Sequence, residues 1–375
     1  MEFIITKARW SVSNCVLSGN SSAGLYNHAG ASMTVANSSI SNNSGTGAHN
    51  NQGTLTVSSC VLSGNSNAGI FNSGTLTVNS CALSGNSGGM SSFGTSTVSN
   101  CIVSGNSYDG IFNGGTLTVS NCDISGNSGN GIGNHAFSSG RANLTIVNSN
   151  VSDNDSIGIS NSTDEFGTLT VTIRSTTVSG NSGGGVDANA CCPFTSSVQV
   201  TITDCTISGN SFYGGIRATG LTNLTVTNST ISGNSVNTGF PPGDSGGGIH
   251  GANYVLVENS TISGNSAATS GGDIYGGSIE IVNSTISGNS AGTSGGGIYE
   301  FGTPLHVSLD VRNSTITGNS APSGGGIYNL RQADTIVEIS NTILNAGASG
   351  ENIFNDGGIS HRLDTTSAAM TAAVI

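Results

Sequence analysis

A tetrad reading Ser-Gly-Asn-Ser, or a close variant of it, recurs along almost the whole chain and restricts the fold more than any other feature. The Asn of the tetrad returns after 20 to 31 residues, and the shortest steps set a basic period of 20 to 22 residues. Three residues before each of these Asn residues stands a branched aliphatic residue, in an unbroken column from Leu17 to Ile316. Self-similarity at this period predicts a stack of repeated structural units.

Each repeat contains three short segments in which apolar and polar residues alternate, typified by TLTV, CxI and GIxN. Turns rich in Gly, Asn and Ser separate these segments, which is typical of short strands. The pattern predicts an all-β parallel β-helix (solenoid) of about 14 coils with three strands per coil. We expect residues 10–356 to form this single domain, residues 1–9 an N-terminal edge segment and residues 357–375 a C-terminal tail.

The Asn column is expected to lie at one corner of the coils, where side-chain amides of successive coils can bond to one another and to the backbone. The residues predicted to form this structural ladder are Asn65, Asn86, Asn106, Asn127, Asn181, Asn210, Asn234, Asn265, Asn289 and Asn319.

Composition excludes several other classes of protein. Only 7% of the residues are charged and 58 of 375 are Gly, so a mainly helical fold is excluded. The net charge of -12 argues against nucleic acid and anionic membranes as partners, because both require a basic patch. No apolar run reaches the ~18 residues of a membrane-spanning helix.

The cysteines indicate packing rather than chemistry. Cys60, Cys81, Cys101 and Cys122 occupy one inward column, in which Ser and Thr stand at the same position of other repeats. A metal site would not tolerate that exchange, so we expect buried thiols, no metal and no cofactor. The adjacent Cys191 and Cys192 fall in an inserted loop, where a strained disulfide and two free thiols remain open alternatives.

Repeats such as NSTISGNSAGTSGGGIYEFGT, residues 283–303, resemble the right-handed parallel β-helix repeats of bacterial surface proteins, notably those of the polymorphic outer-membrane-protein type. The resemblance covers about residues 10–356 and implies a right-handed helix with an extracellular or cell-surface location. It does not define the function, because the same scaffold carries adhesins, pectate lyases, polygalacturonases and phage tailspikes. The opening MEFIITKARW lacks the apolar core of a signal peptide, so we expect a piece of a longer protein or one with trimmed flanks.

An outward column beside the Gly-Ile segment provides the candidate binding and catalytic residues. Asp187, Arg217 and His250 fall on adjacent coils of the face with the longest loops, where β-helix lyases and hydrolases hold their substrates. A polysaccharide lyase or glycoside hydrolase would need clustered acids, and the only further ones are in the neighbouring loops, at Asp164, Glu165 and Asp244. An exposed ladder of mutually satisfied charges is the alternative interpretation. The aromatic members of the column suit stacking on sugar rings, and the predicted ligand-binding residues are Tyr275, Tyr299, Tyr328 and Phe112.

Outward Thr residues form a second regular pattern on a face that is almost free of insertions. Four consecutive coils carry Thr pairs, at Thr54, Thr56, Thr75, Thr77, Thr95, Thr97, Thr116 and Thr118. Such arrays resemble the surfaces of ice-binding proteins, and Thr is also a common polar residue of exposed strands.

Taken together, these patterns favour a non-enzymatic β-helix with a structural, adhesive or carbohydrate-contacting role, whose partners are surface glycans. A polysaccharide-degrading enzyme is the first alternative and ice binding is the second. Strand edges at both ends of the predicted helix could pair with those of another molecule, with Trp10 as the only large apolar lid, so head-to-tail self-association is also an expectation.

Overall fold

The computed structural model describes residues 9–138, 140–192, 196–237, 245–251, 253–301, 308–330, 336–347, 349–356 and 361–364. The expected edge segment therefore lies outside the described residues except for Arg9, and the expected tail lies outside them except for 361–364. The chain divides into two compact units, residues 1–177 and residues 178–375, and each is described by itself.

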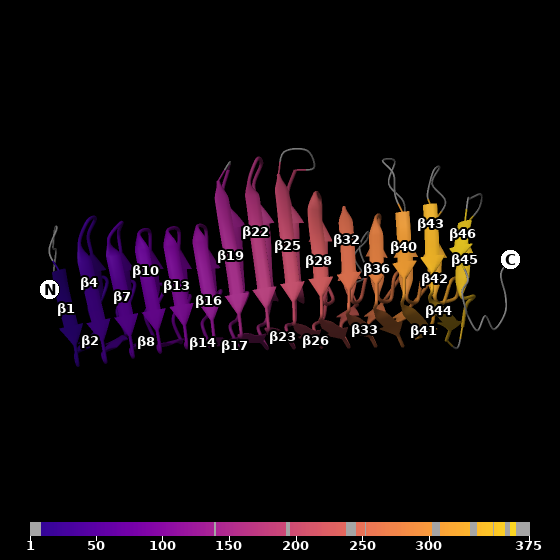
Figure 1. The fold of residues 1–375 in the computed structure, drawn as a ribbon. Helices are drawn as coiled ribbons and strands as arrows, with labels where there is room; N and C mark the ends of the chain where they lie inside the picture. The colour runs from indigo at the N-terminus through magenta and orange to yellow at the C-terminus, as the bar shows by residue number, and fades with distance from the viewer. Residues whose placement is uncertain are drawn as a thin grey trace. The chain divides into compact units, whose positions relative to one another are not determined.

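The first unit consists of parallel strands that repeat in the order predicted from the sequence, one strand of each of three sheets per coil (Figure 1). Its first sheet contains β1 (Arg9–Ser13), β4 (Ser32–Ala36), β7 (Thr54–Ser58), β10 (Thr75–Asn79), β13 (Thr95–Ser99), β16 (Thr116–Ser120), β19 (Arg141–Val147) and β22 (Thr168–Arg174). Its second contains β2 (Val16–Ser18), β5 (Ser39–Ser41), β8 (Val61–Ser63), β11 (Ala82–Ser84), β14 (Ile102–Ser104), β17 (Asp123–Ser125) and β20 (Asn150–Ser152). Its third contains β3 (Leu25–Asn27), β6 (Ala48–Asn50), β9 (Ile70–Asn72), β12 (Met90–Ser92), β15 (Ile111–Asn113), β18 (Ile132–Ala136) and β21 (Ile157–Thr163). The short strand β23 (Thr177–Ser179) contains the boundary between the units.

The second unit repeats the same three-sheet arrangement. Its first sheet contains β25 (Ser197–Thr203), β28 (Thr222–Thr227), β32 (Tyr254–Glu258), β36 (Ile279–Val282), β40 (Ser308–Arg312), β43 (Ile336–Ser340) and β46 (His361–Asp364). Its second contains β26 (Thr206–Ser208), β29 (Thr230–Ser232), β33 (Thr261–Ser263), β37 (Thr285–Ser287), β41 (Thr315–Asn319) and β44 (Ile343–Ala346). Its third contains β24 (Gly184–Ala190), β27 (Ile216–Thr219), β31 (Ile249–His250), β35 (Ile274–Gly276), β39 (Ile298–Glu300), β42 (Ile327–Asn329) and β45 (Ile353–Asn355).

The all-β parallel solenoid with three strands per coil is thus confirmed. One feature was not predicted, a small additional sheet of β30 (Ser235–Val236), β34 (Ser266–Ala267) and β38 (Ser290–Ala291) in the second unit. It forms where the longer repeats of this unit carry extra residues after the tetrad. No helix among the described residues is long and apolar enough to cross a lipid bilayer.

The core consists of the aliphatic columns read from the sequence. Leu83, Val103 and Ile124 pair in register between successive coils and are fully buried. Burying such side chains contributes about 1.5–3 kcal/mol each relative to exposing them. A turn residue with positive φ precedes the Cys column, for example Asn100 at φ 55° and Asn121 at φ 53°. Asn adopts this conformation more readily than most residues and holds the position in most repeats, whereas Ser or Asp holds it in others, as at Ser59 and Asp204. This turn defines the corner between the first and second sheets.

The predicted Asn ladder is present within both units. The side chain of Asn43 donates to Asn65 Oδ1 at 2.8 Å, and that of Asn234 donates to Asn265 Oδ1 at 3.0 Å. A second ladder, which the sequence did not lead us to expect, follows the third sheet of the first unit. There the side-chain amide of Asn27 donates to Asn50 Oδ1, and that of Asn50 donates to Asn72 Oδ1, each at 2.7 Å.

Candidate functional site

An aromatic column runs along the outer side of the third sheet in the first unit and is interrupted at one coil. Tyr26 stacks on His49 with ring centroids 4.5 Å apart, and the His49 and Phe71 centroids are 4.7 Å apart. The next position is Ser91, which pairs in register with Phe71 on one side and Phe112 on the other. Because Ser91 has no ring, the two phenylalanines are separated by two coil rises, roughly 9–10 Å.

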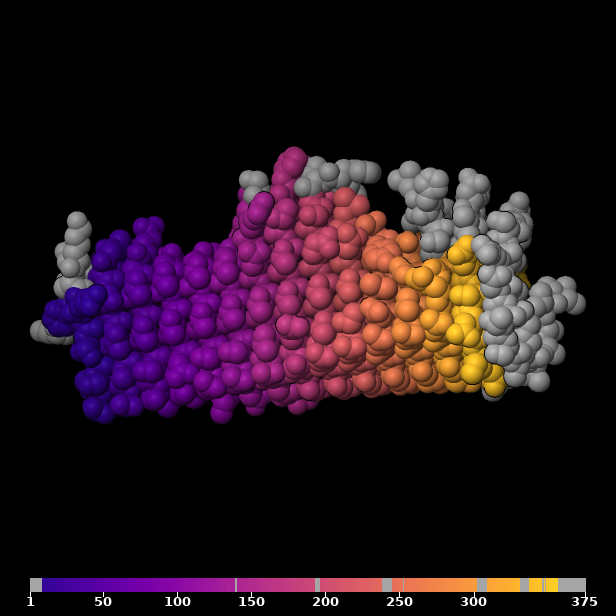
Figure 2. Space-filling model, viewed as in Figure 1, coloured from indigo at the N-terminus to yellow at the C-terminus, as the bar shows by residue number. Residues whose placement is uncertain are grey.

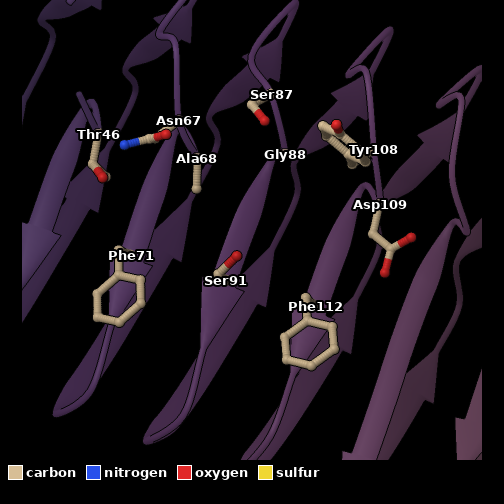
Figure 3. A pocket seen from close by; sticks show the side chains of 10 residues that line it. All are labelled: Thr46, Asn67, Ala68, Phe71, Ser87, Gly88, Ser91, Tyr108, Asp109 and Phe112. Carbon is tan, nitrogen blue, oxygen red and sulfur yellow. The ribbon is translucent and has the colours of Figure 1, made fainter. Parts of the chain in front are cut away.

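The ring of Phe93, two residues after Ser91, lies beside this step of the column, with its centroid 5.7 Å from that of Phe71 and 5.8 Å from that of Phe112. Ser91 and the two other phenylalanines line a cavity of about 460 Å³, which we call the Phe71–Phe112 hollow. Figure 3 shows its lining residues in two rows, with Phe71, Ser91 and Phe112 in one row and the rings of both phenylalanines seen face-on. The other row belongs to the preceding corner of the coils and includes Asn67 and Asp109. The hollow therefore combines two aromatic rings with polar groups along one side.

Asp109 supplies the acidic group of the hollow. Its Oδ1 accepts a hydrogen bond from the backbone N–H of Asn130 at 2.8 Å. Burial raises the pKa of the Asp109 carboxyl above its ordinary value, and the hydrogen bond from Asn130 opposes that shift. Gly133 makes room for this carboxyl, because a Cβ at Gly133 would lie 2.5 Å from Asp109 Oδ2. The carboxyl is thus held beside the rings and can accept hydrogen bonds from a ligand.

The sequence predicted a binding role for Phe112 but did not single out Asp109, Asn67 or the hollow. The only sign of the hollow in the sequence is that GMSS, residues 89–92, replaces the GIFN of the neighbouring repeats. That exchange removes an aromatic residue from the column. The position of Asp109 depends on the path of the corner after the tetrad, which the residue pattern does not define.

Asp187, Arg217 and His250 lie on adjacent coils of the second unit, in register. Arg217 Nη1 is 3.7 Å from Asp187 Oδ1, and its guanidinium lies over the Tyr213 ring at 4.3 Å from the centroid. His250 Nδ1 is 3.1 Å from the carbonyl oxygen of Ser245. The structure therefore brings these residues into one row, as the sequence predicted.

This row differs from the exposed charge ladder considered above, because Asp187 is only 8% exposed. Burial raises the pKa of Asp187 to about 6, although the nearby Arg217 guanidinium lowers it. Burial also lowers the pKa of His250. Of the other acids, Asp164 and Glu165 belong to the first unit, and Asp244 lies outside the described residues. Within the described parts of the chain, no group of three His, Cys, Asp or Glu residues is arranged to hold a metal ion.

The predicted ligand-binding tyrosines form a continuous stack in the second unit. The Tyr275 and Tyr299 centroids are 5.2 Å apart at an interplanar angle of 14°, and those of Tyr299 and Tyr328 are 4.9 Å apart at 2°. Tyr328 stacks in turn on Phe354 at 5.1 Å. Faces that stack on one another are not available to a sugar ring. The stack therefore presents ring edges and hydroxyl groups, and burial with the neighbouring tyrosines raises the pKa of Tyr299 to about 12.

The Thr pairs of the first sheet form the array expected from the sequence. Thr54, Thr75, Thr95 and Thr116 pair in register and all are exposed. Thr56, Thr77, Thr97 and Thr118 form the parallel row, in which Thr77 and Thr97 are exposed and the other two are half-buried. In the space-filling view, this part of the first unit shows rows of atoms repeated from coil to coil (Figure 2). The array has repeats of about 4.8 Å between coils and ~6.7 Å along a strand.

Comparison with known proteins identifies the scaffold. A family model described as right handed beta helix region matches residues 3–116 and 167–345. Among curated proteins, none matches the sequence. Among solved structures, the chain is similar to pectate lyase Pel9A, with 14% identity, a TM-score of 0.38, and 87% of this chain and 73% of that chain covered. It is also similar to the A-module of the mannuronan C-5 epimerase AlgE6 of Azotobacter vinelandii, with 13% identity, a TM-score of 0.39, and 93% of this chain and 91% of that chain covered.

Proposed function

This chain belongs to the right-handed β-helix family, and on that premise we propose that it binds polysaccharide, without cleaving it, at the Phe71–Phe112 hollow. The observation that carries the proposal is the cavity beside Ser91, which is lined by the rings of Phe71 and Phe112 and by the Asp109 carboxyl. Aromatic faces flanked by a few directed polar groups suit sugars, whose rings have both apolar C–H faces and hydroxyl edges.

The dimensions of the hollow support an extended glycan chain over a single small sugar. The two phenylalanines are roughly 9–10 Å apart along the coil stack, which is close to the length of a disaccharide. A chain lying along the third sheet can thus place alternate sugar rings on Phe71 and Phe112. The hydroxyl groups of the intervening sugar then face Ser91 and Asp109.

The proposal assigns the chain a carbohydrate-contacting, adhesive role outside the cell or at its surface. The likeness of its repeats to those of surface β-helix proteins supports that location. At the Asp187–Arg217–His250 row we expect no hydrolase or lyase turnover, because its one carboxyl is paired with Arg217. Assays of reducing ends and of unsaturated products on a glycan panel test this expectation. Turnover that is abolished by Asp187→Asn would instead favour the enzyme.

The binding experiment uses a glycan array followed by calorimetry with the best oligosaccharide. Ser91→Phe should place a ring in the hollow and fill it, so we expect loss of binding with an unchanged fold. Ser160→Phe is the matched control, since Ser160 occupies the same column position at another coil and does not line the hollow. Phe112→Ala should also weaken binding. A Ser91→Phe variant that binds as well as the parent would exclude this site.

The in-register Thr rows favour a second candidate function, the ordering of ice-like water on the first sheet. Their two repeats are close to those of oxygen atoms on a prism face of ice, and each Thr offers a hydroxyl and a methyl group. Thermal hysteresis and ice-recrystallisation assays test this function. Thr75→Lys and Thr97→Lys should abolish any activity, whereas Ser91→Phe should leave it unchanged, which separates the two candidates.

A further inference from the structure

Three chemically complementary side chains meet in the first unit beyond the regular part of the third sheet. The strands β18 and β21 are longer than the three-residue strands before them, because their repeats carry insertions. In this extension His135 pairs in register with Ser162, and Asp164 follows β21 directly. None of these residues lines the Phe71–Phe112 hollow.

Hydrogen bonds connect the three side chains in a row. Ser162 Oγ lies 2.7 Å from His135 Nδ1, and Asp164 Oδ1 lies 3.2 Å from His135 Nε2. The second carboxylate oxygen of Asp164 accepts the backbone N–H of Ser138 at 3.1 Å. A carboxylate can only accept hydrogen bonds, so a neutral His135 donates its Nε2–H to Asp164. Its Nδ1 then accepts a hydrogen bond from the Ser162 hydroxyl.

This connectivity meets the geometric criterion for an activated nucleophile. A hydroxyl must lie within hydrogen-bond reach of a base, and a third group must orient that base. An ion pair with Asp164 alone would engage only one ring nitrogen of His135. Here the second nitrogen is directed at a hydroxyl, and the backbone of Ser138 holds the carboxylate that fixes the ring.

The group is also within reach of a ligand. The side chain of His135 is 22% exposed and that of Asp164 is 49% exposed, and Ser162 is half-buried. The ring of Phe137 meets that of His135 edge-on at 4.3 Å and is itself exposed. Phe137 also lies 6.1 Å from Phe112, between centroids, and so connects this group to the aromatic wall of the hollow.

We propose that Ser162, His135 and Asp164 form a nucleophilic site that cleaves acyl esters, such as the O-acyl groups of a saccharide. Ser162 Oγ bonds to the acyl carbonyl carbon while His135 takes its proton, and the ester C–O bond then breaks. His135 returns that proton to the departing alcohol oxygen. A water molecule, deprotonated by His135, next attacks the acyl carbon of the acyl-serine. The acyl C–Oγ bond breaks, the carboxylic acid is released, and His135 returns the proton to Ser162 Oγ. Asp164 is a positioning residue that keeps His135 in the required tautomer.

Only the choice of a saccharide ester rests on the proposed function, and the reactivity of Ser162 does not. The experiment therefore begins with the whole chain and two reagents that require no sugar binding, p-nitrophenyl acetate and a fluorophosphonate that phosphonylates activated serines. We expect ester cleavage above the buffer rate and one phosphonyl adduct on the peptide that contains Ser162. Absence of both would overturn the proposal, even if glycan binding at the hollow is found.

Variants separate the roles of the three residues. Ser162→Ala should abolish the adduct and the cleavage, whereas Ser160→Ala, two residues away on the same strand, should change neither. His135→Gln should slow cleavage by about 100-fold or more, as removal of a general base does. Circular dichroism and melting curves establish that each variant is folded. An adduct rate unchanged in His135→Gln would contradict the base role.

The exposed position of Asp164 provides a second test with little risk to the fold. Asp164→Asn should lower the cleavage rate about tenfold or more and change its pH profile, whereas Asp164→Glu should restore part of the rate. A purely structural role would alter the melting temperature but not the pH profile.

Discussion

The side-chain amide of Asn65 donates to Asn86 Oδ1 at 2.8 Å, and the backbone N–H of Asn65 donates to the same oxygen at 3.1 Å. Asn86 repeats both interactions with Asn106 on the next coil, at 3.3 Å and 3.0 Å. Each buried side chain thus satisfies one backbone N–H and one side-chain N–H of the preceding coil. The corner of the coil depends on Asn because its amide nitrogen donates to both Leu62 O and Asn106 Oδ1, whereas a hydroxyl has only one hydrogen to donate.

Replacing Asn86 by Ala should therefore destabilise the first unit by about 3 kcal/mol, since buried donors of Asn65 and the Leu62 carbonyl lose their partner. Urea unfolding followed by circular dichroism measures the change. Ser66→Ala, at an exposed position just after the tetrad Asn of the preceding coil, is the control and should be nearly neutral. A cost below about 1 kcal/mol for Asn86→Ala would show that the ladder contributes little.

The repeat period explains why the fold could be predicted and much of the site could not. The columns of Leu83, Val103 and Ile124 recur at one position of each repeat, so their burial follows from the period alone. The second Asn ladder corresponds to the Asn of GIxN, but the alternation of apolar and polar residues in that segment does not show that its amide points inward and bonds to the next coil. The sheet to which a residue belongs depends on its place in the regular part of each repeat, which the sequence shows directly.

Features that depend on inserted residues or on a single exchange do not follow from the repeat period. Ser162 and Asp164 meet His135 because two inserted segments of different length extend neighbouring strands together, and repeat alignment ignores such residues. The hollow depends on one exchange, at Ser91, and on the path of the corner that carries Asp109. Stacking of Tyr299 on Tyr328 was implied by the column, but the consequence that ring faces become unavailable required the ring orientations.

The thiols of the Cys column should accept hydrogen bonds from the backbone N–H groups of the preceding coil, as the Ser hydroxyls at the same position do. The backbone N–H of Cys81 donates to Cys101 Sγ at 3.4 Å, just as that of Cys122 donates to Ser149 Oγ at 3.2 Å. Cys101→Ser should therefore cost less than about 1 kcal/mol, whereas Cys101→Val leaves the Cys81 N–H unsatisfied and should cost about 2 kcal/mol. Thermal unfolding of the two variants compares these values. Equal costs would mean that packing alone determines this column.

The aliphatic column can be tested in the second unit by charge insertion. Ile207 is fully buried, so Ile207→Asp places a carboxyl in an interior that offers no solvation and should cost roughly 4 kcal/mol or more. The adjacent Thr206 is exposed on the same strand, and Thr206→Asp should change stability by less than about 0.5 kcal/mol. The two variants carry the same added charge, so denaturation midpoints isolate the effect of burial. Similar midpoints would be incompatible with the inward direction of Ile207.

A buried carboxyl in the second unit should make stability fall as pH rises. Asp273 is completely buried, and it directly precedes Ile274, which pairs in register with Ile249 and Ile298 on the adjacent coils. A Cβ at Gly248 would lie 2.3 Å from Asp273 Oδ1, so the small neighbour makes room for the carboxyl. Asn265 donates to Oδ1 at 3.1 Å, and Oδ2 has no hydrogen-bond partner among the described residues. Burial raises the pKa of Asp273 well above its ordinary value of 3.8.

Since the unfolded chain releases this proton at a lower pH than the folded one, the unfolded state gains stability as pH rises above about 4. The contribution of Asp273 to the free energy of unfolding is therefore greatest below about pH 4 and declines until the folded carboxyl ionises. Asp273→Asn keeps the volume and the Asn265 contact but removes the titration, so we expect a flatter profile and higher stability at pH 8. Asp187→Asn is the comparison, because its pKa of about 6 confines its effect to the window between about pH 4 and 6. Urea midpoints measured from pH 4 to 9 decide the matter, and an Asp273→Asn profile parallel to that of the parent would show that Asp273 is not the responsible group.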